Sequence, residues 1–151
     1  MIPNHVQQVL DRWDLKALEF EPGSTPTVET AAAQIGVSCG EIAKSILMKG
    51  KDEQYRMFVL AGDKPVSSGK MKRCTGVKQS MANAEETLKV TGFAPGAVCP
   101  FGVEGIEIYI DISIDAYDVV YPAAGTDASG VPVSYQQLVE ITSGIPCDIT
   151  R

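Results

Sequence analysis

The chain has 151 residues, of which 44% are hydrophobic and 21% are charged, and this predicts a single domain over residues 1–151 with a substantial core. No apolar run is long enough to span a membrane, and the N-terminal Met1-Ile2-Pro3-Asn4-His5 lacks the basic and apolar segments of a secretion signal, so we expect a cytoplasmic protein. The formal net charge of −6 argues against a general nucleic-acid binder, because counterion release from phosphates requires basic surface.

The N-terminal part of the chain predicts two helices separated by a short strand. Apolar residues at helical spacing predict an amphipathic helix over residues 3–14, and a strand is expected over residues 17–21. Thr27 can cap a second helix, which Gly36 would end in a left-handed conformation.

The middle of the chain predicts a β-hairpin and then a basic helix. Apolar runs predict strands over residues 42–48 and 55–61, and the polar segment between them is typical of a hairpin turn. Ser67 or Ser68 then begins a basic helix that runs through Arg73.

The C-terminal half mixes further strands and helices. Asn83 suggests a helix start, strands are expected over residues 107–112, 119–121 and 131–134, and Ser134 can cap a last helix. Because strands and helices are interspersed and hairpins are present, the pattern predicts an α+β fold with a mixed sheet flanked by helices.

The segment from Thr91 to Gly102 can form neither a helix nor a regular strand, because glycines and prolines interrupt it. Its residues Phe93, Val98 and Phe101 nevertheless make it too apolar for a flexible linker. A rigid loop of this kind holds main-chain N–H groups in fixed directions, and glycine allows a ligand to approach them. The segment is therefore a candidate cradle for an oxyanion or a phosphate, and the alternative is a tight structural turn.

Lys44 places a cation within the apolar run that predicts the strand over residues 42–48. It either contacts a ligand or extends its aliphatic stem from a half-buried face. Residues 44–78 carry nine Lys and Arg against three acids, whereas residues 90–151 carry one base against eight acids. This asymmetry suggests a narrow phosphate-guiding strip beside Lys44, the alternative being a solvated face. The strip comprises Lys64, Lys70, Lys72, Arg73 and Lys78.

Several kinds of catalysis are disfavoured by composition. His5 is the only histidine, so Ser-His-Asp triads, Cys-His pairs and multi-histidine metal sites are not expected. The four cysteines lie far apart without a Cys-x-x-Cys pair, which argues against zinc and against a disulfide framework. No Walker or dinucleotide fingerprint is present, so we expect neither a metal nor a cofactor.

Five motifs occur in order along the chain: residues 26–32 (Pro-Thr-Val-Glu-Thr-Ala-Ala), Ile42-Ala43-Lys44-Ser45, the Gly-x-x-x-Pro loop of residues 96–100 with Phe101-Gly102, Ile110-Asp111, and Ala123-Ala124-Gly125. In this order and at this spacing they resemble the YbaK/EbsC family, relatives of the editing domain inserted in bacterial prolyl-tRNA synthetases. The resemblance runs from Pro26 to the C-terminus. It implies that family's fold, a single α+β domain with a curved mixed sheet flanked by helices.

The resemblance also implies an activity and a partner. Family members hydrolyse amino acids wrongly esterified to tRNA, which implies an aminoacyl-tRNA deacylase acting on the acceptor 3′ end of a mischarged tRNA. Proline tRNA carrying Cys, Ala, Ser or Thr is the expected substrate. These 151 residues include no synthetase portion, so we expect tRNA choice to depend on the acceptor end or on a partner synthetase.

The expected site follows from the same motifs, from the segment Thr91 to Gly102 and, for Lys70 and Lys72, from the basic strip. An aminoacyl ester has a ribose leaving group whose neighbouring hydroxyl can assist, so the protein must bind the terminal adenosine and stabilise the oxyanion. The expected catalytic residues are Lys44, Gly96, Ala97, Val98, Cys99 and Pro100. The expected substrate-binding residues are Thr27, Thr91, Gly92, Phe101, Gly102, Gly125, Lys70 and Lys72. Many relatives have serine where this chain has Ala124, which puts a hydroxyl contact from that position in doubt.

Two alternatives of other classes stay open. One is a non-catalytic regulatory module that binds an aminoacyl group or a nucleotide. The other is a hydrolase with Cys99 as its nucleophile, activated by Lys44 or by a helix terminus. Asp111 could orient the loop or face water.

Overall fold

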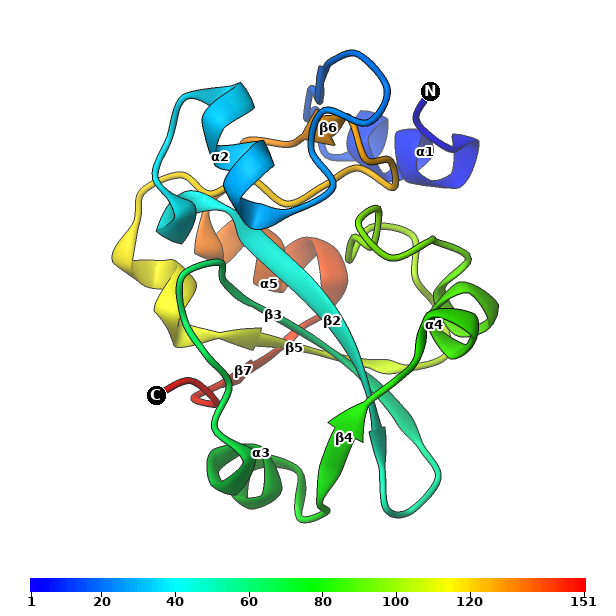
Figure 1. Ribbon diagram of the computed structural model, residues 1–151, viewed down its shortest axis with the longest axis vertical. Helices are drawn as coiled ribbons and strands as arrows, with labels where there is room; N and C mark the ends of the chain where they lie inside the picture. The colour runs from blue at the N-terminus through cyan, green and yellow to red at the C-terminus, as the bar shows by residue number, and fades with distance from the viewer.

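The computed structural model describes all 151 residues, and a five-stranded mixed sheet in the order β4-β2-β3-β5-β7 lies at its centre (Figure 1). β2 is antiparallel to β3 and β4, whereas β5 is parallel to β3 and β7. A second, two-stranded sheet pairs β1 with β6. The strands are β1 (Leu18–Glu19), β2 (Ala43–Gly50), β3 (Tyr55–Ala61), β4 (Gln79–Met81), β5 (Glu107–Asp111), β6 (Ser129–Gly130) and β7 (Ile145–Cys147).

Side-chain caps explain where four of the five α-helices begin. Thr27, Ser67, Asn83 and Ser134 each accept a hydrogen bond from the main-chain N–H three residues later, which confirms the predicted helix starts. None of the helices has the length and apolar character needed to cross a membrane. The helices are α1 (Asn4–Arg12), α2 (Val28–Ile35), α3 (Ser68–Thr75), α4 (Ala84–Thr91) and α5 (Tyr135–Thr142), with 3-10 turns at Cys39–Glu41 and Ile112–Ala116.

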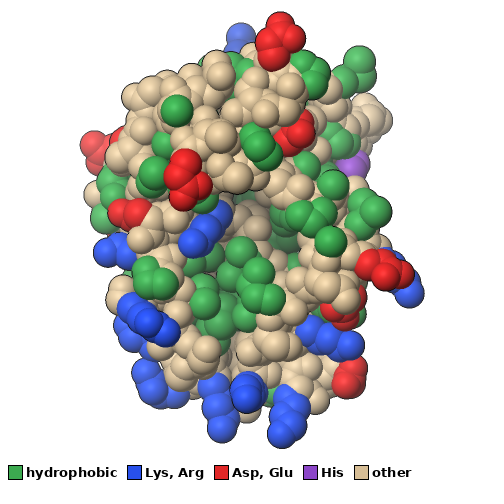
Figure 2. All heavy atoms as spheres, viewed as in Figure 1, with side chains coloured by type: hydrophobic (Ala, Val, Ile, Leu, Met, Phe, Trp, Pro, Cys, Tyr) green, Lys and Arg blue, Asp and Glu red, His purple; other side chains and the backbone are tan.

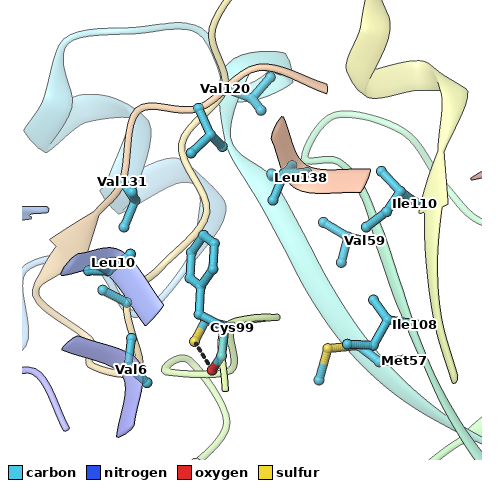
Figure 3. Packing of buried hydrophobic residues seen from close by; sticks show 14 of the residues in the cluster. Val6, Leu10, Met57, Val59, Cys99, Ile108, Ile110, Val120, Val131 and Leu138 are labelled. Carbon is cyan, nitrogen blue, oxygen red and sulfur yellow. Dashed lines mark hydrogen bonds between the residues drawn. The ribbon is translucent and has the colours of Figure 1, made fainter. Parts of the chain in front are cut away.

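The two faces of the central sheet are covered by different layers. On one face α1, α5 and the loop of residues 93–103 pack against the apolar side chains of β3 and β5, including Met57, Val59 and Ile110 (Figure 3). On the other face α3 contributes Met71 to a smaller cluster with Phe58 and other residues. The sheet is therefore buried on both sides, as the predicted α+β architecture requires.

Several predicted strands differ from those observed. The strands expected over residues 119–121 and 131–134 are wrong, because only a single antiparallel bridge joins Val120 to Val133. Pro122 and Pro132 interrupt these segments, and proline lacks the N–H that a ladder needs. The sequence patterns did not predict β4 and β7, which have three residues each and are too short to show alternation.

The carboxylate of Asp111, at the end of β5, joins three segments of the chain. It is fully buried, and it accepts hydrogen bonds from the Ile149 N–H at 2.7 Å, the Thr150 hydroxyl at 3.0 Å and the Ser113 N–H at 3.0 Å. The sequence left Asp111 open between orienting the loop and facing water. Its partners show that it holds the C-terminal segment against β5.

We expect Asp111→Asn to lower the free energy of unfolding by about 2–3 kcal/mol, because it removes one accepting oxygen from a buried group with three donors. Urea denaturation followed by circular dichroism measures this loss. Asp118→Asn, at an exposed position without a hydrogen-bond partner, serves as the control and should change stability by less than about 0.5 kcal/mol. Equal stability of the two variants would contradict the structural role of Asp111.

Candidate active site

A cavity of about 240 Å³ lies where β2, the start of α2 and the Gly96 loop meet. Figure 2 shows a hollow near the middle of this face of the molecule. Three short segments far apart in sequence form most of the wall: residues 25–28, residues 42–45 and the pair Gly96 and Val98. Ala31, Tyr121, Ala123 and Ser129 complete it.

Lys44 brings an uncompensated cation to this cavity. It lies in β2, opposite Leu60 of β3, and its side chain is half-buried. None of the ion pairs in the structure involves Lys44. A lysine ammonium without a carboxylate partner is available to attract an anionic or carbonyl oxygen of a ligand.

The first turn of α2 faces the same cavity. Thr27 accepts a hydrogen bond from the Thr30 N–H at 3.2 Å, and Thr27 and Val28 both line the wall. The N–H groups of a first helical turn have no partners inside the helix and carry a partial positive charge. The cavity therefore has two sources of positive potential, the Lys44 ammonium and the α2 N-terminus.

Gly96 brings its loop close to the entrance of α2. Its φ is +89°, in the left-handed region, and a Cβ at this position would lie 3.0 Å from the Pro26 carbonyl oxygen. Any other residue would be strained by its backbone conformation and by this contact. The loop thus needs glycine here in order to close this side of the cavity.

The predicted site residues separate into those at the cavity and those away from it. Thr27, Lys44, Gly96 and Val98 line the wall. Ala97, Pro100 and Phe101 are buried residues of the same loop that lie outside the lining. Ala97 and Phe101 belong to the main core cluster, and we interpret them as anchors of the loop.

The Cys99 side chain is directed into the core and not toward the cavity. Figure 3 shows it near Val6, Leu10 and Val131, and its thiol donates a hydrogen bond to the Phe101 carbonyl at 3.7 Å. Burial raises the pKa of the Cys99 thiol to about 12, so it is a neutral thiol at physiological pH. This geometry argues against Cys99 as a nucleophile.

Four other predicted binding residues lie away from the cavity, and each has a structural role there. Thr91 donates to the Thr87 carbonyl at 2.6 Å, and Gly92 ends α4 in the left-handed conformation. A Cβ on Gly102 would lie 2.8 Å from the His5 ring, and one on Gly125 would lie 2.9 Å from the Phe93 ring. None of the four lines the cavity.

The two predicted lysines of the basic strip lie on α3, away from the cavity lining. The Lys70 ammonium contacts the Asp148 carboxylate at 3.1 Å and donates to the Thr150 carbonyl at 2.8 Å, so it helps to hold the C-terminal segment. Lys72 is exposed and makes no ion pair. In Figure 2 the Lys and Arg side chains gather along the lower edge of the face that contains the hollow.

Sequence reasoning missed several cavity residues. Ser45 directly follows Lys44 in the quoted motif, and that adjacency was the available signal. Tyr121 and Ser129 reach the wall only through tertiary contacts: the Tyr121 carbonyl accepts from the Ala43 N–H, and the Ser129 N–H donates to the Thr25 hydroxyl. No cluster of three or more His, Cys, Asp or Glu side chains in the structure could hold a metal ion.

Comparison with known proteins identifies the family. The family model described as the aminoacyl-tRNA editing domain matches residues 22–141. The chain belongs to this family. The matched range contains all the cavity residues, so the cavity is part of the editing domain itself.

The chain is also similar to individual proteins and to a solved structure. The "Uncharacterized protein YwhH" of Bacillus subtilis is 38% identical over 125 residues, which cover 82% of this chain and 79% of that protein. The proline–tRNA ligase of Bacillus licheniformis is 35% identical over 100 residues, which cover 65% of this chain but only 17% of the ligase. A solved structure described as "a putative trans-editing enzyme for prolyl tRNA synthetase" superposes with a TM-score of 0.86 at 27% identity, and the match covers 100% of this chain and 99% of that chain.

Gly96→Ala tests whether the loop position matters for activity beyond its backbone conformation. We expect it to destabilise the editing domain by about 1–2 kcal/mol through the left-handed φ. We also expect it to lower deacylation of mischarged tRNA by about tenfold or more, because the contact with Pro26 displaces a wall of the cavity.

Gly105→Ala is the matched control. Gly105 has a similar φ of +81°, and a Cβ there would meet no atom within 4 Å. Melting temperature and deacylation rate are measured for both variants. If each variant loses deacylation rate in proportion to its loss of stability, the Gly96 loop has only a structural role.

Proposed function

We propose that this editing domain is an aminoacyl-tRNA deacylase that acts in trans on proline tRNA wrongly charged with Cys, Ala, Ser or Thr. The observation that carries the proposal is the cavity, in which Lys44 and the main chain at Gly96 lie beside the N-terminus of α2. The similarity to part of a proline–tRNA ligase and to the trans-editing structure supports proline tRNA as the carrier.

In the proposed reaction a water molecule attacks the ester carbonyl, and the bond between the carbonyl carbon and the ribose oxygen breaks. The ribose oxygen takes up a proton, and the free amino acid and the intact tRNA 3′ end leave. The adjacent ribose hydroxyl can orient the water, so no histidine or cysteine nucleophile is needed. Lys44 and main-chain N–H groups at the cavity wall stabilise the negative charge on the carbonyl oxygen.

The size of the cavity favours small amino acids. A volume of about 240 Å³ is below the roughly 300–1,000 Å³ typical of small-molecule pockets. Apolar side chains such as Val28, Ala31 and Ile42 form part of its wall. An aminoacyl group the size of alanine, serine, cysteine or threonine fits this space better than an aromatic one.

Lys44→Ala should lower the deacylation rate of the best substrate about a hundredfold or more, because it removes the only side-chain cation at the cavity. Melting temperature should stay close to that of the unmodified protein, since the side chain is half-buried and unpaired. The measurement is a deacylation assay on Cys-, Ala-, Ser- and Thr-charged proline tRNA.

Two variants serve as comparisons in the same assay. Lys51→Ala, at an exposed lysine beyond the end of β2, should retain the full rate. Cys99→Ala should change the rate less than about threefold, whereas a loss of several thousand-fold would favour covalent catalysis. Full activity of Lys44→Ala would refute the proposed role, and an unmodified protein that binds mischarged tRNA without hydrolysing it would favour the non-catalytic alternative.

We further propose that exposed members of the basic strip guide the acceptor stem. α3 and the residues before β4, which carry them, lie at the lower end of the molecule in Figure 1, and Figure 2 shows Lys and Arg side chains gathered at that end of the face with the hollow. Since Lys70 already pairs with Asp148, Lys72 and Lys78 are the better candidates to test.

The double variant Lys72→Glu/Lys78→Glu should bind tRNA more weakly and with a shallower salt dependence, the slope falling by about 0.7–0.9 for each phosphate that the variant no longer neutralises. Turnover of a small aminoacyl-adenosine mimic should not change, because the mimic lacks the stem phosphates. Lys16→Glu/Lys89→Glu makes the same change of net charge at exposed positions outside the strip and is the control. Identical salt slopes for the two double variants would exclude the strip from tRNA binding.

A further inference from the structure

The outer edge of β2 has a gap in its hydrogen bonding. Even-numbered residues of β2 direct their main-chain groups toward β3, as the bonds from the Gly62 N–H to the Ile42 carbonyl and from the Gly50 N–H to the Gln54 carbonyl show. Odd-numbered residues therefore direct their N–H and C=O groups to the opposite edge. On that edge β4 pairs with β2 only at Met48–Gly50.

The gap is centred on Ser45. On one side of it the Ala43 N–H donates to the Tyr121 carbonyl at 3.3 Å, and on the other side the Leu47 carbonyl accepts from the Ala82 N–H at 3.0 Å. Between these bonds the N–H and C=O of Ser45 have no partner in the protein. The Ser45 hydroxyl oxygen is also buried without a hydrogen-bond partner.

This gap borders the cavity. Ala43, Lys44 and Ser45 line it from one side, and Gly96 and Val98 line it from the other. Native proteins rarely leave a buried polar group unpaired. The buried Ser45 hydroxyl, next to two main-chain groups without a protein partner, therefore points to a ligand that supplies the partners.

An α-aminoacyl group can supply the hydrogen-bond donor and acceptor that the Ser45 C=O and N–H lack. Its α-amino group is a donor and its carbonyl is an acceptor, and the two are separated as in a single residue of a β-strand. Two opposed residues of an antiparallel pair exchange N–H···O=C bonds in both directions. An aminoacyl group can therefore occupy the place of one opposing residue.

We propose that Ser45 recognises the aminoacyl group of the substrate as one strand residue recognises another. The Ser45 carbonyl accepts from the α-amino group, and the Ser45 N–H donates to the ester carbonyl. This inference rests on the proposed function and adds to it the element that distinguishes an α-aminoacyl ester from other acyl esters. The Lys44 side chain is on the opposite face of the strand and does not compete for the Ser45 main-chain groups, so this pairing leaves the proposed role of Lys44 unchanged.

The pairing also fixes the direction of the substrate side chain. Directly opposed residues of an antiparallel pair project their side chains to the same face. The substrate side chain then lies beside the Ser45 side chain, on the face of Ala43, which packs into the main core cluster. The unpartnered Ser45 hydroxyl is in position to bond a hydroxyl or thiol there, so serine, threonine and cysteine are favoured over alanine.

Non-hydrolysable amides of 3′-amino-3′-deoxyadenosine test the main-chain contact by titration calorimetry. The alanyl amide should bind about tenfold to a hundredfold more tightly than the propionyl amide, which lacks only the α-amino group. In NMR spectra the Ser45 amide proton should shift on addition of the alanyl amide and not on addition of adenosine. Equal affinity of the two amides, or an unperturbed Ser45 amide proton, would overturn the proposal.

The Ser45→Ala variant tests the side-chain contact. The unmodified protein should bind the seryl amide about two- to tenfold more tightly than the alanyl amide, and Ser45→Ala should remove that preference but retain the preference for alanyl over propionyl. Ser80→Ala, at an exposed position of β4, should retain both preferences. A seryl preference that survives in Ser45→Ala would refute the role of the hydroxyl. Because these are binding measurements, the inference can fail while tRNA deacylation is observed, and it can hold if deacylation is absent.

Discussion

The architecture of this protein depends on the incomplete pairing of one strand. β4 covers only the last residues of β2, so the first half of that strand would present an open edge, and exposed sheet edges invite association with other chains. Three segments enclose it instead: the start of α2, the loop around Gly96, and the chain near Tyr121. They enclose the edge without pairing with it along its whole length. The cavity is the space that remains.

The loop that closes the cavity has its position because of its buried residues. Phe93, Cys99 and Phe101 are part of the main core cluster, with α1 packed against them. They anchor the loop in the core. Gly96, by contrast, lies so close to Pro26 that a side chain at this position would collide with it. The segment thus combines two kinds of residue. Its apolar residues make the loop rigid, and its glycine lets the main chain come close to Pro26 at the cavity. The charges are divided in a similar way: Asp111 and Lys70 hold the C-terminal segment, whereas Lys44 reaches the cavity without an acidic partner.

Local features of the fold could be predicted from the sequence, because they depend on residues close together in the chain. The helix starts at Thr27, Ser67, Asn83 and Ser134 and the hairpin of β2 and β3 follow from capping residues and apolar runs. The ordered motifs were likewise sufficient to indicate the editing family, and they contain Lys44, Gly96 and Val98, which line one cavity in the structure.

Which residues of these motifs meet is a property of the tertiary structure. Gly96 and Cys99 are three positions apart, yet Gly96 faces the cavity while the Cys99 thiol is directed into the core, and no local pattern encodes that difference. The contributions of Tyr121 and Ser129, and the unpaired main chain of Ser45, depend on hydrogen bonds made or omitted between distant segments. Such pairing is settled by the packing of the whole chain, because an edge is open only if no other strand has covered it.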